Sequence, residues 1–140
     1  MYKPLKNRQS GFTLIEVLVV VIIVAILAAV AFPIYQQYVK SAYASDAQAT
    51  IGAIINASKM YYQDNGEYPN DVTLLDPKYL QIDDATNRAW TFTIEASGTK
   101  LTTVKAMSTE NMKQGSDHEV IYTAETGEFT GYGFDEETTE

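Results

Sequence analysis

The 140-residue chain contains no cysteine, one histidine and one tryptophan. Without cysteine it forms neither a disulfide framework nor a thiolate nucleophile, so its small folded part relies on packing, on assembly with neighbours or on a bound ion. The single histidine, His118, lies in a polar segment, where we expect a solvated loop residue. No side chains in the sequence combine into a catalytic set. We therefore predict that the protein is not an enzyme and requires no cofactor.

Positive charge is scarce outside the N-terminus. Ten Lys and Arg face eighteen Asp and Glu, for a formal net charge of -8. Lys3, Lys6 and Arg8 all precede Gly11, so the chain beyond Gly11 carries about -11 by the same count. An acidic surface repels phosphate backbones and anionic membranes. We therefore expect the folded part to bind no nucleic acid.

One long apolar run dominates the N-terminal third, from Phe12 to Tyr35. A helix of roughly 20 apolar residues crosses a bilayer core of about 30 Å, so this segment is long enough to span a membrane. The basic residues before Gly11 favour a cytoplasmic N-terminus with the rest of the chain outside. Glu16 is the exception in the run, and a carboxylate at membrane depth requires a partner.

An ordinary signal peptide is one explanation of the same segment. It would consist of the basic start, the apolar run and a small-residue cleavage site at Ala29-Val30-Ala31. The protein would then be a Sec-exported or membrane-anchored periplasmic binding module. A carboxylate inside the apolar run has no role in a signal peptide, so Gly11 to Glu16 favours a different explanation.

The motif Gly11-Phe12-Thr13-Leu14-Ile15-Glu16 with its apolar continuation resembles the type IV pilin family, which includes the pseudopilins of type II secretion. The resemblance implies that a prepilin peptidase cleaves between Gly11 and Phe12, and that Phe12 becomes N-methylated. It also implies that Glu16 pairs with the N-terminal amine of a neighbouring subunit during assembly. Pairing offsets the desolvation of both charges and fixes the axial register.

The resemblance further implies a homo-oligomeric helical filament built by a pilus or secretion assembly machinery. The precursor would lie in the bacterial inner membrane, and the product would be an extracellular pilus or, alternatively, a periplasmic pseudopilus. Pro33 stands near the end of the apolar run, where it removes a helical hydrogen bond and is expected to kink the helix. Many members of the type IV pilin family that this chain resembles have a glycine at the position of Ala25.

An amphipathic pattern follows the apolar run. Ala44, Ala47, Ile51, Ile54, Ile55 and Tyr61 recur at helical spacing. We therefore expect one helix from Phe12 to Gln63, ended at Asp64-Asn65-Gly66 by a left-handed glycine. The resulting division is a leader at 1–11, a transmembrane and filament-core helix at 12–35, and a head at 36–140, with helix to residue 65.

The rest of the head alternates polar and apolar residues with the period of strands. After a loop at 66–88, with a helical turn at Val72 to Leu75, we predict an antiparallel sheet over 89–134. Its four strands are expected at 89–96, 101–107, 119–124 and 128–134, followed by an acidic tail at 135–140. The fold class is α+β, with one face of the sheet, including Trp90, Phe92 and Ile94, against the apolar stripe of the helix.

Three oxygen-bearing residues, Asn111, Asp117 and Glu119, are weak candidates for binding Ca²⁺ through a C-terminal loop. The segment lacks the dense alternation of Asp and Asn found in dedicated calcium loops. We therefore predict that the protein has no metal site. Asn111, Asp117 and Glu119 are the only candidates that the sequence offers for one.

Overall fold

The structure is a computed structural model that describes residues 11–134, so the predicted leader and the acidic tail at 135–140 lie outside the described residues. The chain divides into two compact units, Met1–Gln37 and Tyr38–Glu140. The boundary falls inside helix α1 (Leu14–Asn65). Each unit is described by itself.

The described part of the first unit is helical from Leu14 onward, two residues later than predicted. The helix begins there because Thr13 caps it: the Glu16 amide donates to the Thr13 hydroxyl, and the Val17 amide donates to the Thr13 carbonyl at 3.3 Å each. Pro33 lies within α1, and the helix continues on both sides of it. The expected kink at Pro33 stays a prediction.

In the second unit, α1 ends at Asn65 against Gly66, whose φ of 79° is the left-handed conformation expected at this cap. The Gly66 amide donates to the Tyr62 carbonyl oxygen at 2.8 Å. The chain then passes through a short 3-10 helix, η1 (Val72–Leu74), at the predicted helical turn. The segment predicted as loop also contains helix α2 (Asp84–Ala89), because the Asp83 carboxylate caps the amides of Ala85 and Thr86.

The sheet is a four-stranded antiparallel meander in the order β1-β2-β3-β4, as predicted. Its strands are β1 (Trp90–Ser97), β2 (Lys100–Ser108), β3 (Glu119–Thr123) and β4 (Glu128–Gly131). Strand β4 ends three residues before the predicted Phe134, because the chain turns there and the Phe134 amide donates to the Gly131 carbonyl at 2.9 Å.

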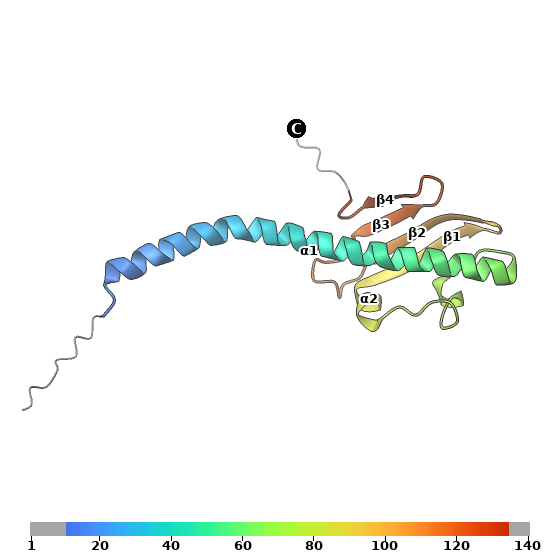
Figure 1. The fold of residues 1–140 in the computed structure, drawn as a ribbon, viewed down its shortest axis with the longest axis horizontal. Coiled ribbons are helices and arrows are strands. Elements are labelled where there is room, and N and C mark those ends of the chain that lie inside the picture. The colour runs from blue at the N-terminus through green and yellow to red at the C-terminus, as the bar shows by residue number, and fades with distance from the viewer. Residues whose placement is uncertain (1–10, 135–140) are drawn as a thin grey trace, which may run out of the picture. The chain divides into compact units, whose positions relative to one another are not determined.

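One face of the sheet packs against the second half of α1, which runs beside all four strands in Figure 1. Side chains of β1 alternate between buried and exposed, as the sequence predicts. The buried core contains residues of α1, of three strands and of the connecting loops, namely Ala47, Ile51, Ile54, Ile55, Ala57, Leu75, Trp90, Phe92, Ile94, Leu101, Val104, Ala106, Met112 and Val120. This two-layer α+β head confirms the predicted fold class.

Candidate functional site

The N-terminal end of α1 is built around the predicted assembly carboxylate. One oxygen of Glu16, Oε2, accepts hydrogen bonds from the amide and the hydroxyl of Thr13, both at 2.8 Å. The Glu16 amide in turn donates to the Thr13 hydroxyl. This reciprocal arrangement is a capping box, in which a Thr before the helix and a Glu three residues later satisfy each other's backbone donors.

Glu16 therefore has partners within its own chain, which the sequence reasoning did not foresee. The signal was present, because Thr13-x-x-Glu16 directly before an apolar run is the pattern of a capping box. The two bonds from Thr13 converge on Oε2, and the other oxygen, Oε1, accepts no hydrogen bond from residues 11–134. The side chain is thus oriented by Thr13 and still presents an acceptor.

Unlike a helix of a folded core, the first half of α1 exposes its apolar side chains all around. Relative exposure is 46% at Val19, 60% at Val30 and 83% at Leu14. A continuous apolar surface of this kind marks a membrane-embedded or protein-binding segment. Helix α1 is the one helix in the described part of the chain that is long and apolar enough to cross a membrane.

The three weak calcium candidates do not come together. Asn111 lines a hollow beside α2, whereas Asp117 and Glu119 line a different hollow on the outer face of the sheet. Within residues 11–134 there is no group of three or more His, Asp or Glu side chains arranged to hold a metal ion.

The expectation of a solvated His118 is wrong. Its ring is half-buried and lies on the ring of Tyr132, with 4.2 Å between centroids. Nε2 is 3.1 Å from the Gln114 carbonyl oxygen. Lys40 Nζ lies 5.5 Å from the Tyr132 centroid, so this tyrosine links α1 to the loop that carries His118. His118 is therefore packed against other side chains of the head, which its polar neighbours in the sequence did not indicate.

The carboxylates of Asp46, in α1, and Asp83, the N-cap residue of α2, repel each other. Desolvation raises the pKa of Asp46, the nearby Asp83 charge raises it further, and a hydrogen bond from Thr86 acts in the opposite direction. Hydrogen bonds from the Thr86 side chain and amide lower the pKa of Asp83. The pair shares one hollow with Arg88 and Lys113, so cations are available there to compensate.

Comparison with known proteins places two family models on the chain. Residues 6–32 match a prokaryotic N-terminal methylation motif. Residues 33–118 match a family described as "Type IV minor pilin ComP, DNA uptake sequence receptor". Together they cover the N-terminal motif and most of the head.

Several curated proteins are similar to between about half and two thirds of this chain. The fimbrial protein EcpC of Eikenella corrodens is 46% identical over 67 residues, which are 48% of this chain and 44% of that protein. A fimbrial protein of Neisseria meningitidis serogroup A is 38% identical over 101 residues, 66% of this chain and 59% of that protein. The type II secretion system core protein G of Aeromonas hydrophila is 44% identical over 71 residues, 51% of this chain and 50% of that protein. This chain spans about half the length of these relatives.

Proposed function

Because this chain belongs to the type IV pilins, in the family described as type IV minor pilin ComP, we propose that it is a structural subunit of a type IV pilus-like filament. The observation that carries the proposal is the exposed apolar surface of the first half of α1. This surface begins beside Glu16, whose carboxylate is hydrogen-bonded by Thr13. Copies of that surface cover one another when the helices pack side by side. A repeated, non-closing contact of this kind produces a helical filament.

Before assembly, the same apolar surface is covered by lipid. The N-terminal methylation motif and the long apolar helix indicate membrane anchoring of the precursor. We propose that residues 1–11 stay cytoplasmic, that the head lies outside, and that a prepilin peptidase cuts between Gly11 and Phe12. Residues 11–13 precede the helix and are exposed, so the bond between Gly11 and Phe12 is accessible to the peptidase. Phe12 would then carry the new, methylated N-terminus.

In the filament, the role proposed for Glu16 is to receive the N-terminal amine of a neighbouring Phe12. Oε2 is held by Thr13, which leaves Oε1 to accept the ammonium. An ammonium buried among apolar helices is stabilised by a carboxylate that already has a fixed orientation. Thr13 therefore supports the pairing, while Glu16 supplies the charge.

Two substitutions of Glu16 separate charge from capping. Gln preserves a residue type that completes a capping box but removes the charge, whereas Val removes both. Co-expressed with a prepilin peptidase and the assembly machinery, both variants should be cleaved normally and accumulate as membrane monomers with little sheared filament. Thr13→Ala retains the charge and should retain measurable assembly.

The three variants are compared by immunoblot of the sheared and membrane fractions, with intact mass measured to confirm cleavage. Abundant filaments from Glu16→Gln, as the sole subunit, would show that the carboxylate acts only as a cap. Abundant filaments from Glu16→Val would remove Glu16 from the assembly mechanism altogether.

A second candidate function is favoured by the similarity to a type II secretion system core protein G. A pseudopilin has the same kind of N-terminal helix and acts with a secretion apparatus. Complementation distinguishes the two, because the chain should restore surface filaments in a pilin deletion strain and should leave secretion unrestored in a pseudopilin deletion strain. The reverse pattern would establish the pseudopilin role.

The matched family is described as a DNA uptake sequence receptor, yet we propose that the head of this chain binds no DNA. Residues 38–134 contain thirteen Asp and Glu against seven Lys and Arg. Two of those cations are already paired, Lys78 with Asp64 at 3.0 Å and Lys105 with Glu95 at 2.9 Å. Phosphate recognition needs clustered cations. A fluorescent duplex titrated with the chain at about 50 mM salt should remain unbound, and salt-dependent binding would refute the proposal.

A further inference from the structure

The dipeptide Asn65-Gly66, at the end of α1, combines the residues that favour one spontaneous reaction. Of the six asparagines in the sequence, only Asn65 is followed by glycine. An asparagine side chain loses ammonia when the backbone nitrogen of the next residue attacks its Cγ atom, which makes asparagine a thermolabile residue. Glycine has no Cβ to shield that nitrogen. Both residues are exposed, and a Cβ added at Gly66 would meet no atom within 4 Å, so the space around the bond is open.

The folded structure holds both reacting nitrogens in hydrogen bonds. The attacking atom is the Gly66 nitrogen, whose N–H donates to the Tyr62 carbonyl oxygen at 2.8 Å. The leaving group is the Asn65 side-chain amide, whose Nδ2 donates to the Tyr61 carbonyl oxygen at 2.9 Å. The reaction breaks both bonds, since the Gly66 nitrogen gives up its proton and Nδ2 departs as ammonia. Attack therefore requires the last turn of α1 to open.

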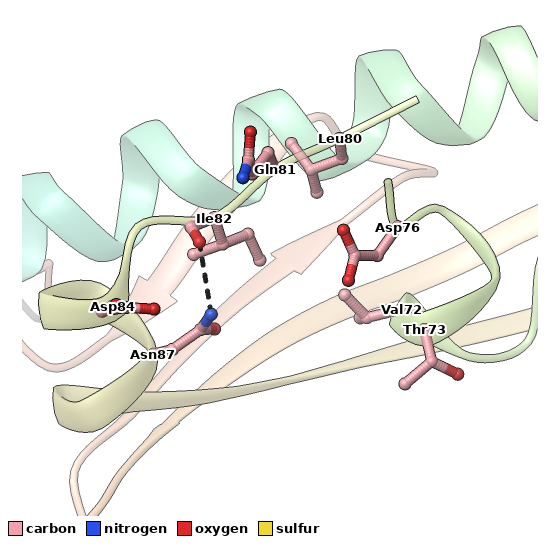
Figure 2. A pocket seen from close by; sticks show the side chains of 8 residues that line it. All are labelled: Val72, Thr73, Asp76, Leu80, Gln81, Ile82, Asp84 and Asn87. Carbon is pink, nitrogen blue, oxygen red and sulfur yellow. Dashed lines mark hydrogen bonds between the residues drawn. The ribbon is translucent and has the colours of Figure 1, made fainter. Parts of the chain in front are cut away.

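Asp64 ties this last turn to the chain that follows η1. Its Oδ2 accepts hydrogen bonds from Lys78 Nζ at 3.0 Å and from the Tyr79 hydroxyl at 2.7 Å. Asp76, the carboxylate closest to Lys78 in sequence, lines a hollow between η1 and α2 instead (Figure 2). Lys78 and Tyr79 thus hold the helix end on the side that precedes Asn65.

The chain beyond Gly66 is held as well. The Tyr68 amide donates to the carbonyl oxygen of Gly98, in the β1–β2 hairpin, at 2.8 Å. The Tyr68 ring stacks on that of Tyr62, with 4.7 Å between centroids. A helix end opens more easily than a helix centre unless such contacts hold it. Asn65-Gly66 is therefore exposed to water and still restrained on both sides.

From this arrangement we propose that Asn65 is a latent site of spontaneous deamidation, which the closed end of α1 protects and which reacts when that turn opens. In the open state the Gly66 nitrogen bonds to Asn65 Cγ, the bond from Cγ to Nδ2 breaks, and ammonia leaves a cyclic succinimide. Water then opens the succinimide at either carbonyl and leaves aspartate or isoaspartate in place of the asparagine. Water is the only co-reactant. The proposal does not rest on the filament function.

The products weaken the cap that prevented the reaction. Either product adds a negative charge between Asp64 and Glu67, at the end of α1 where the helix dipole is already negative. Either product also lacks the Nδ2 donor that bonds the Tyr61 carbonyl in the unmodified chain. Isoaspartate inserts a further methylene into the backbone. The modification therefore marks, irreversibly, molecules whose helix end has opened.

The reaction is followed in the full chain in non-ionic detergent micelles at pH 8, with and without guanidinium chloride. Mass spectrometry of the peptides that contain Asn65 measures the deamidated fraction over time. Without denaturant Asn65 should react at least about tenfold more slowly than with it, because only open molecules react. Equal rates would show that the cap gives no protection. Absence of product in denaturant would remove the site.

Lys78→Met/Tyr79→Phe removes both donors to Asp64 and should accelerate the reaction of the folded chain about two- to fivefold, with no change in denaturant. Tyr79→Phe alone should accelerate it less, which tests the restraint if the double variant misfolds. Lys59→Met is the control, because Lys59 is exposed and forms no ion pair within residues 11–134. Equal rates for the control and the Lys78 and Tyr79 variants would overturn the protection by the helix end.

Gly66→Ala tests the chemical route separately from the protection. In denaturant, where the cap is absent, the added Cβ shields the attacking nitrogen, so the variant should react severalfold more slowly than wild type. An undiminished rate in denaturant would show that the product forms without attack by this nitrogen, and would overturn the proposed route.

Discussion

The two halves of helix α1 have the same backbone conformation and opposite surroundings. Every residue from Gly11 to Tyr38 is exposed, whereas the second half buries one stripe that includes Ala47, Ile51 and Ile54. The second half has its covering layer in the same chain, the four-stranded sheet. The first half has an apolar surface of the kind that lipid or other polypeptides cover.

The comparison separates folding from assembly. Apolar residues all around a helix indicate a segment that other molecules cover, and a single stripe indicates packing within the domain. Changes in the second half should therefore act on the stability of the head. Changes at the start of the first half should act on processing and assembly while leaving the head folded.

The largest expected effect is at Gly11, where Gly11→Glu should abolish cleavage. A peptidase site that accepts glycine has no space for a charged side chain. Intact-mass measurement on membranes should show the full precursor, while Gly11→Ala, which keeps a small residue, should still be trimmed. Trimming of Gly11→Glu to begin at Phe12 would contradict the assigned site, and a mature chain beginning at Phe32 would establish the signal-peptide alternative.

In the second unit, Trp90→Ala should destabilise the head by about 3–5 kcal/mol, a large fraction of a small domain's stability. Trp90 is 1% exposed within the core. Thr91→Ala, on the opposite face of β1, is the matched control and should change little. A denaturant titration of residues 36–140 compares the midpoints. Equal midpoints for Trp90→Ala and wild type would be incompatible with the buried position of the indole.

Gly133→Ala should cost about 2–4 kcal/mol, from backbone strain and overpacking combined. Its φ is 81°, and an added Cβ would lie 2.3 Å from the Ala44 Cβ of α1. Gly127→Ala is the control, because φ is 74° there but a Cβ meets no atom within 4 Å. In the same titration Gly127→Ala should therefore cost less by about 1–3 kcal/mol.

The contact itself is tested by adding Ala44→Gly to Gly133→Ala. The double variant should recover part of the loss, because removal of the Ala44 methyl makes room for the new one. If the two changes are simply additive, the close approach of these residues contributes nothing to the cost.

Much of this architecture could be predicted from the sequence, because periodicity reports burial directly. Alternation at Trp90, Phe92 and Ile94 predicted the buried face of β1, and the helical spacing of Ile51, Ile54 and Ile55 predicted the stripe opposite it. The left-handed cap at Gly66 follows from local chemistry as well.

The remaining features depend on contacts that periodicity does not encode. Helix α2 is only six residues long, which is too short to show an apolar periodicity in the sequence. It depends instead on capping by the side chain of Asp83. His118 is half-buried because Tyr132, which is close only in the fold, covers its ring. The separation of Asn111 from Asp117 and Glu119 is likewise a property of the tertiary arrangement. The roles of Gly11, Phe12 and Glu16 in processing and assembly stay predictions.

The smallest expected effect contrasts two carboxylates of the head whose pKa values shift in opposite directions. The pKa of Asp46 is raised in the folded state, so its ionisation opposes folding as pH rises through that pKa. The pKa of Asp83 is lowered, so its ionised form stabilises the fold above the unfolded pKa, and that contribution disappears as pH falls through the folded pKa.

Asp46→Asn should therefore raise the unfolding midpoint slightly at pH 7, and Asp83→Ala should lower it, since the variant also loses the cap of α2. Each difference from wild type should shrink in acid. For Asp46→Asn the difference vanishes below the unfolded Asp pKa of about 3.9, and for Asp83→Ala its charge-dependent part vanishes only below the lower folded value. Thermal unfolding from pH 3 to pH 7 measures both curves. A lower midpoint for Asp46→Asn at pH 7 would mean that the Thr86 hydrogen bond outweighs desolvation and the repulsion from Asp83.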